Sequence, residues 1–172
     1  MQQPGSETWK WGLLAGLAAY ALWLIFAYDY HFIDHVNLVF HEAGHVIFSP
    51  FGLTLGFLGG TIGQLFFPVA IAVHFWRRGQ RFEAAIGAFW LAESGMYAAQ
   101  YMADAKARVL PLVGGGQHDW YFLFSRWGLL EASEGIAAFV HLLCAGLLVA
   151  VLVFMYRLLR QGTVQEVSWP DE

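Results

Sequence analysis

Two histidines and a glutamate stand in an order that can bind a metal ion and use it. The stretch HVNLVFHEAGHVIFSPFG, residues 35–52, contains His41, Glu42 and His45 as His-Glu-x-x-His. Residues four apart lie on one face of a helix, so both imidazoles can reach one Zn²⁺ at about 2.0–2.1 Å. Glu42 is rotated away from the ion and can act as general base, while the metal lowers the pKa of water toward about 7. The pattern therefore predicts a site for one zinc ion or another divalent transition metal.

The alternative interpretation is that His41 and His45 are packed core histidines and that Glu42 pairs with a neighbour. In a membrane helix this alternative is costly, because three adjacent ionisable groups would each need a partner at apolar depth. We therefore favour the metal site.

A third protein ligand is normal in a catalytic zinc site, with water in the fourth position. We expect His118, because the three glycines of GGGQHDW, residues 114–120, let the backbone fold back toward a site. The alternatives for the third ligand are Asp104, and after it Glu93 or Asp119. Asp119 can instead be a helix N-cap before WYFLF.

Further metal-capable side chains surround the motif. The segment DYHFIDH, residues 29–35, holds His31 and His35, which either bind a second metal or lie in the polar headgroup region. A metal carrier or sensor could take up its ion there. Asp34 precedes His41 by seven residues, about 10 Å along a helix, and so cannot share an ion with it.

A glycine-rich segment, LGGTIGQLFFP at residues 58–68, offers a possible substrate contact. Small residues there can serve close helix packing. They can equally form an irregular edge that pairs with an extended substrate backbone, with Gly59, Gly60 and Gln64 in contact with it.

Composition indicates what must position these residues. Hydrophobic residues make up 58% of the 172-residue chain and charged residues 13%, against about 25% charged in soluble domains. The net charge is −4 and the basic residues are scattered, which argues against nucleic-acid binding. The single cysteine excludes an internal disulfide and a cysteine-based zinc site. We expect an integral membrane protein whose surface faces the lipid bilayer.

The pattern of apolar runs predicts an all-α fold, a polytopic membrane bundle of about five hydrophobic helices with the metal site between them. Residues 1–172 form a single integral membrane domain, in which residues 1–8 are a flexible tail. The expected spans are 11–28, 32–49, 61–76, 82–103 and 132–159.

With its motif in a hydrophobic span, the chain resembles the site-2-protease type of intramembrane zinc metalloproteases. That family cuts substrate helices within the bilayer and takes an aspartate from a later helix as third ligand. The resemblance implies that His41 and His45 bind zinc and that Glu42 is the general base. Asp104 is the nearest match to the family's aspartate, although the family's Asn-Pro-x-Asp-Gly type of context reads MADAKA here.

The chain also resembles a set of small bacterial membrane proteins that carry His-Glu-Ala-Gly-His, then Ala-Asp-Ala, then a glycine run with His-Asp-Trp. Together these observations predict a membrane-embedded zinc-dependent hydrolase, foremost a peptidase, in a bacterial cell membrane. A membrane protein would be its substrate or partner. The alternative is a non-catalytic metal-binding accessory or structural subunit of a membrane complex.

Overall fold

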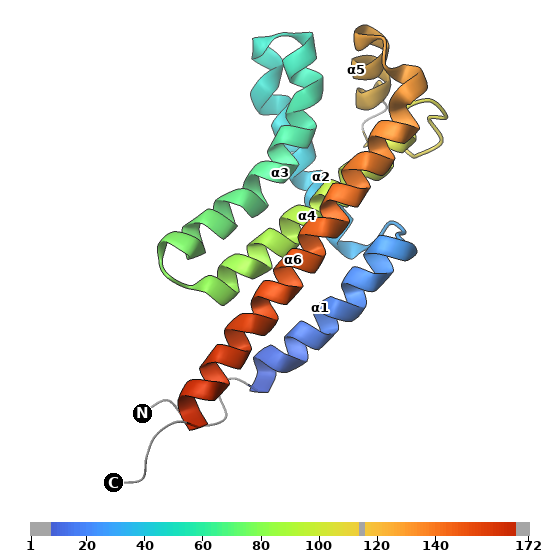
Figure 1. The fold of residues 1–172 in the computed structure, drawn as a ribbon. Coiled ribbons are helices and arrows are strands. Elements are labelled where there is room, and N and C mark those ends of the chain that lie inside the picture. Colours follow the sequence, from blue (N-terminus) through green and yellow to red (C-terminus); the bar gives the residue numbers. More distant parts are fainter. Residues whose placement is uncertain (1–7, 114–115, 168–172) are drawn as a thin grey trace.

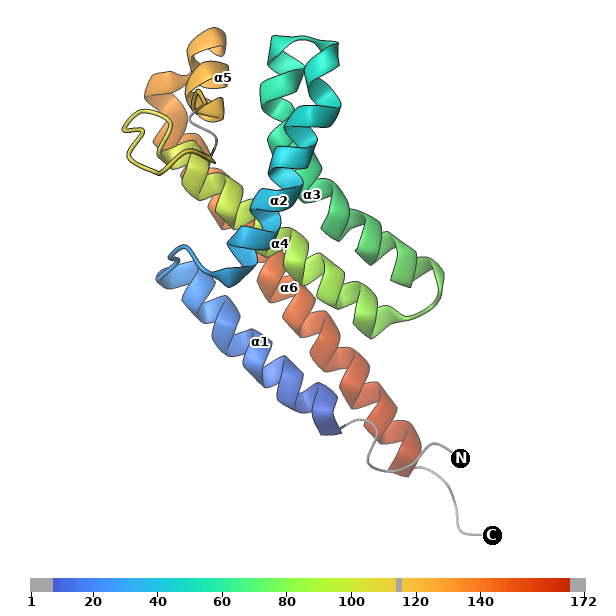
Figure 2. The ribbon, with the colours of Figure 1, turned by 180° about the vertical axis from the view of Figure 1, so that it is seen from behind.

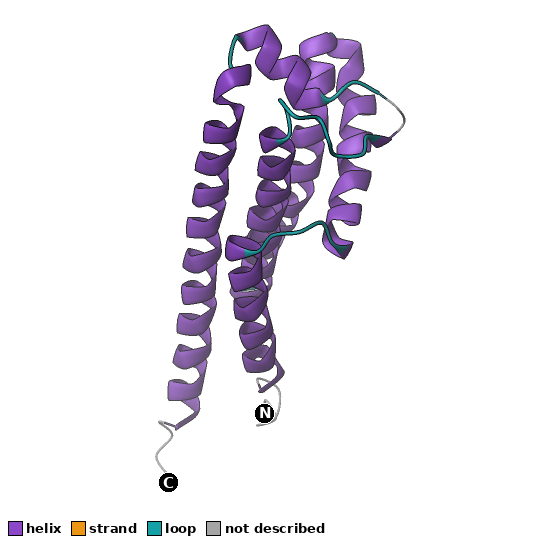
Figure 3. Ribbon diagram, turned by 90° about the vertical axis from the view of Figure 1, so that its right-hand side faces the viewer, coloured by secondary structure: helices purple, strands orange, loops and turns teal. Residues whose placement is uncertain are grey.

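The computed structural model describes residues 8–113 and 116–167, and within them every regular element is helical. The predicted all-α class is confirmed (Figures 1 and 3). The predicted tail at residues 1–8 lies, except for its last residue, outside the described part. The elements are α1 Thr8–Phe26, α2 Phe32–Phe48, η1 Ser49–Phe51, α3 Leu53–Arg77, α4 Arg81–Ala103, α5 Asp119–Trp127, η3 Leu130–Ala132 and α6 Ser133–Val167.

Three helical segments are long and apolar enough to cross a membrane: Thr8–Phe26, Leu53–Arg77 and Leu130–Gly162. Large apolar side chains on them remain exposed, such as Leu22 at 60% and Leu142 at 68%, as lipid-facing positions require. The other two expected spans correspond to α2 and α4, which carry several charged or polar side chains. The five-span arrangement therefore stays a prediction.

Helix α4 lies at the centre of the bundle, between α3 and α6 (Figures 1 and 2). It has no single buried face, because small residues on several sides let its neighbours approach. A Cβ on Gly87 would lie 2.8 Å from the backbone nitrogen of Ala72 in α3, and one on Gly95 would lie 2.5 Å from Cys144 Sγ in α6. This close packing lets α4 present side chains to two different polar clusters.

Helices α2 and α3 form an antiparallel hairpin. Pro50 and Gly52 lie in the turn that follows α2, and Gly52 takes the left-handed φ of 103° that turns the chain into α3. A Cβ on Gly44 would lie 2.1 Å from the carbonyl oxygen of Gly59, so the two backbones can touch only where both lack side chains.

The segment from residue 58 to 68 is the interior of α3, which begins at Leu53 and not near residue 61 as expected. The predicted irregular edge is thus wrong for this segment. All of its backbone groups lie in a helix, and its glycines serve the packing of α3 against α2.

Helix α5 packs over the end of α4 and the start of α6. Trp120, Leu123 and Phe124 are buried there against Met102 and Ala137. Burial of these aromatic and aliphatic groups fixes the short helix, and with it the residue at its first position, beside the α2–α3 hairpin (Figures 1 and 2).

Candidate metal centre

Side chains from two separate helices bring three potential ligand atoms together. Asp119 Oδ2, on α5, lies 2.8 Å from His41 Nε2 and 3.1 Å from His45 Nε2, both on α2. Two ligand atoms of a tetrahedral zinc site with bonds near 2.0 Å lie about 3.3 Å apart. The separations here are a few tenths of an ångström shorter. The three residues can therefore hold a metal ion.

His41 is held so that Nε2 presents a lone pair. Its Nδ1 lies 2.9 Å from Gln64 Oε1, while the amide nitrogen of Gln64 donates to the carbonyl oxygen of Ser94 at 2.9 Å. Because that carbonyl can only accept, the orientation of the Gln64 amide is fixed, and His41 must carry its proton on Nδ1.

His45 is held in the same way by the backbone. Its Nδ1 donates to the carbonyl oxygen of Gly56 at 2.7 Å, in the first turn of α3. Such a bond fixes the ring orientation and leaves Nε2 as the free acceptor, the arrangement found around histidine ligands of metals.

The ligand atoms of His41, His45 and Asp119 favour a cation between them. With both histidines protonated on Nδ1, two Nε2 lone pairs face an oxygen of the Asp119 carboxylate. Burial raises the pKa of Asp119, but the two imidazoles outweigh it and lower the pKa below its usual value. A proton on one Nε2 would pair that ring with Asp119 but leave the other lone pair facing the carboxylate, and protons on both would place two imidazolium rings only 4.7 Å apart. A divalent metal satisfies all three groups at once.

Gly60 leaves room beside the two imidazoles. A Cβ on this residue of α3 would lie 2.4 Å from His41 Nε2 and 2.6 Å from His45 Nε2. With glycine at this position, no side-chain carbon blocks the Nε2 lone pairs of the two rings.

Asp119 is positioned by α4 and by the start of α5. Its backbone N–H donates to the hydroxyl of Tyr101 at 3.1 Å. The preceding residue, His118, is the N-cap of α5, and its Nδ1 accepts from the backbone N–H of Tyr121 at 3.2 Å. Asp119 is therefore the first residue of the helix and not its cap.

His118, the expected third ligand, supports the site from outside. Burial lowers its pKa, despite the nearby carboxylate of Asp104, so the ring is neutral. Since Nδ1 accepts from the helix, the proton lies on Nε2, which faces Asp104 Oδ2 at 3.3 Å. His118 thus contributes no lone pair to the metal centre.

Asp104, the first alternative, binds its own loop. Its carboxylate accepts from the backbone N–H groups of Val109 at 2.9 Å and Leu110 at 3.0 Å. Glu93, the next alternative, lies with His31 and Asp34 in a second cluster. Of the residues considered for the third ligand, the structure brings only Asp119 to His41 and His45.

The expected substrate contacts Gly59, Gly60 and Gln64 are buried in the α2–α3 packing, and none of them lines the cavity beside the centre. Gln64 instead orients His41. The contact of Gly56 with His45 can be read from an antiparallel hairpin, because the two residues lie six and five residues from Pro50. The contact of Gln64 with His41 cannot, because these residues lie 14 and nine residues from it.

A cavity of about 830 Å³ opens beside the three ligand atoms. Glu42 lines it together with His41, His45 and Asp119, and Tyr101 lies in the same wall. Most of the remaining wall is apolar and comes from the start of α3 and the loop before α5: Leu53, Phe57, Leu110, Pro111, Leu112 and Val113.

Comparison with models of protein families, with curated proteins and with solved structures finds no match for this chain. The function must therefore follow from the chemistry of the centre, namely three convergent donor atoms, one acidic neighbour and a largely apolar cavity.

Proposed function

We propose that this protein is a membrane-embedded, zinc-dependent hydrolase, and specifically a peptidase of the site-2-protease type. One observation carries the proposal: the three ligand atoms of His41, His45 and Asp119 meet at the wall of a cavity that Glu42 also lines. A structural zinc site takes four protein ligands and closes, whereas a catalytic site takes three and keeps one position accessible.

Zinc, when bound, supplies Lewis acidity that polarises a carbonyl group and makes water a nucleophile near neutral pH. The chain's own residues hold the ion and move the proton. Gln64 and the Gly56 carbonyl keep His41 and His45 in the tautomer that can coordinate. Asp119 adds the one negative charge among the three ligands.

Glu42 is the general base of the proposed reaction. Its carboxylate takes a proton from the attacking water, whose oxygen bonds to the carbonyl carbon of the peptide. The C–N bond then breaks, and Glu42 returns the proton to the leaving nitrogen, so the carboxylate is regenerated. The position next to His41 on α2 keeps Glu42 at the cavity without making it part of the ligand group.

The apolar wall indicates the kind of substrate. Leucine, proline, valine and phenylalanine side chains surround the space beside the ligands, which suits an apolar peptide segment. We propose that the substrate is a membrane protein and that the resident ion is zinc. We also propose that the chain crosses a bacterial cell membrane five times.

The test is replacement of the base. Purified full-length protein in nanodiscs, loaded with zinc, is incubated with a pool of fluorogenic apolar peptides. We expect Glu42→Gln to reduce cleavage by at least about 100-fold, because the amide cannot accept the proton. Metal content should match the wild type, since Glu42 is not a ligand.

Glu83→Gln, at the first turn of α4, is the matched control and should cleave at the wild-type rate. Full activity in Glu42→Gln contradicts the mechanism. The non-catalytic accessory subunit is the competing function, and it predicts that cobalt spectra of the centre do not respond to an added zinc-binding inhibitor such as a hydroxamate.

A further inference from the structure

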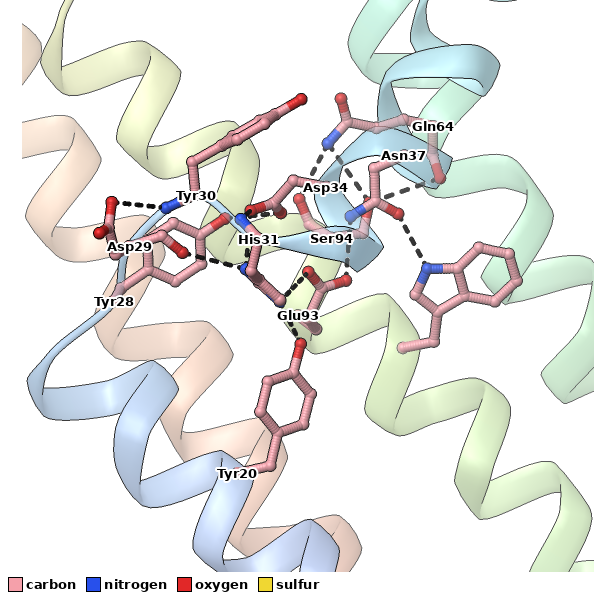
Figure 4. A network of polar contacts seen from close by, with 11 residues as sticks. Tyr20, Tyr28, Asp29, Tyr30, His31, Asp34, Asn37, Gln64, Glu93 and Ser94 are labelled. Atoms are coloured by element: carbon pink, nitrogen blue, oxygen red, sulfur yellow. Dashed lines mark hydrogen bonds and ion pairs between the residues drawn. The ribbon is translucent and has the colours of Figure 1, made fainter.

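A second cluster of ionisable side chains lies where the start of α2 meets α4 and α1 (Figure 4). His31, Asp34 and Glu93 each offer a ligand atom, and these atoms lie within 4.8 Å of one another. Asp34 and Glu93 are essentially inaccessible, with 0% and 1% of their surface exposed. Two buried carboxylates in one place need a compensating positive charge.

Asp34 determines which nitrogen of a neutral His31 ring carries the proton. The backbone N–H of His31 donates to Asp34 Oδ2 at 3.0 Å, and Tyr28 donates its hydroxyl proton to Oδ1 at 2.7 Å. Nδ1 of His31 faces two acceptors, Asp34 Oδ2 at 2.8 Å and the carbonyl oxygen of Asp29 at 3.0 Å. The proton of a neutral His31 ring is therefore on Nδ1, and Nε2 presents a lone pair.

Glu93 points an unpaired oxygen at that lone pair. Its Oε2 accepts from the amide nitrogen of Asn37 at 2.9 Å, and Trp90 Nε1 donates to Asn37 Oδ1 at 2.8 Å, which fixes the Asn37 amide. Glu93 Oε1 is buried and has no hydrogen-bond partner among the described residues. It lies 3.6 Å from His31 Nε2, close to the edge of about 3.3 Å between two ligands of a tetrahedral ion.

We propose that His31 Nε2 and Glu93 Oε1 bind a divalent transition-metal ion at a second site, where Asp34 orients the His31 ring by accepting its Nδ1 proton. A divalent ion balances both carboxylates, whereas one proton would leave a net negative charge in an apolar surrounding. Imidazole nitrogen and carboxylate oxygen suit zinc, manganese or iron(II) better than soft copper(I). The phenol of Tyr20, which contacts His31 Nε2, is a further oxygen at the site.

The second site is separate from the metal centre at His41 and independent of hydrolysis. Asp34 and His41 are seven residues apart on α2, about 10 Å along the helix axis. Two ions held by different ligands would therefore bind to one chain, and each site can be removed without deleting a ligand of the other.

Metal content tests the proposal. Full-length protein in nanodiscs is loaded with zinc, freed of excess metal and analysed by mass spectrometry. We expect about two ions per chain in the wild type, about one in Glu93→Gln, about one in the double variant His41→Ala, His45→Ala, and none when all three changes are combined. Glu83→Gln on the same helix is the control and should retain both ions.

Two outcomes overturn the second site: two ions in a folded Glu93→Gln protein, or no ion in the His41→Ala, His45→Ala protein. Anomalous scattering at the zinc edge from wild-type crystals gives an answer even where a variant fails to fold. A peak between His31 and Glu93 supports the site, and a peak at His41 and His45 alone contradicts it.

Discussion

His41 and His45 share a helix face, yet different parts of α3 hold their rings. Gln64 accepts from His41 through a side chain that is itself fixed by Ser94, whereas Gly56 accepts from His45 through its backbone carbonyl. A side-chain acceptor can be altered by mutation and a carbonyl cannot. The two ligands therefore differ in how readily substitutions in α3 disturb them.

The third ligand is the sharpest prediction at the scale of residues. We expect Asp119→Asn to weaken zinc binding at the His41 centre by more than about 100-fold, because the carboxylate is a direct ligand in the proposed centre. Asp104→Asn should weaken it by less than about 10-fold, because Asp104 holds only the loop that leads to α5. Zinc titration in the Glu93→Gln background measures this centre alone.

If Asp104→Asn weakened zinc binding more than Asp119→Asn, Asp104 would be the third ligand and the assignment of Asp119 would be wrong. Both substitutions replace one carboxylate oxygen with an amide nitrogen of nearly equal size, so each variant serves as the steric control for the other.

At these positions, the sequence predicts only what the spacing of neighbouring residues determines. His41 and His45 are four residues apart, and any helix brings them to one face. His118 and Asp119 are neighbours, and only the start of α5 decides which of them turns inward. The N-cap is His118 itself, an unusual capping residue that composition does not suggest.

At the scale of elements, the α2–α3 hairpin determines the space around the ligands. Gly60→Ala tests this role, because the added methyl group would lie 2.4 Å from His41 Nε2 and 2.6 Å from His45 Nε2. We expect at least about 10-fold weaker zinc binding and a loss of stability of about 1–3 kcal/mol from overpacking. Zinc titration and thermal unfolding measure the two effects.

Gly16→Ala in α1 is the matched control, since nothing lies within 4 Å of its added Cβ. It should leave zinc affinity unchanged and not lower stability. Unchanged zinc affinity in Gly60→Ala would mean that α3 can move away from the rings, and the close α2–α3 contact would not define the site.

The helices themselves were largely predictable, because apolar runs, prolines and glycines mark their ends locally. The end of α2 at Phe48 lies one residue from the expected position, whereas the start of α3 was missed because Gly56, Gly59 and Gly60 look unlike a helix in isolation. Their fit against α2 offsets the intrinsic cost of glycine in a helix, and that fit is a tertiary property.

At the scale of the whole molecule, the proposed metal centre links two parts of the bundle. In the part of the chain that the structure describes, α2 and α5 are otherwise connected through α3 and α4, against which both helices pack. We expect removal of zinc by a chelator to increase hydrogen exchange in α5 more than in α6, since the bound ion stabilises only the docked arrangement.

Exchange monitored by mass spectrometry checks this, with the His41→Ala, His45→Ala protein as control. There the chelator should not alter exchange in α5. Equal exchange in the wild type with and without chelator would show that apolar packing of Trp120 and Leu123 alone holds the helix.

The distance along the chain between His45 and Asp119, 74 residues, has a consequence for how the protein is made. At about 5–20 residues per second, a ribosome completes the histidine pair roughly 4–15 s before it adds the aspartate. During that interval the nascent chain carries an incomplete chelating pair, which other ligands can occupy. Loading of the proposed ion must therefore wait until α5 has emerged and docked, so we expect it to be a late event in biogenesis.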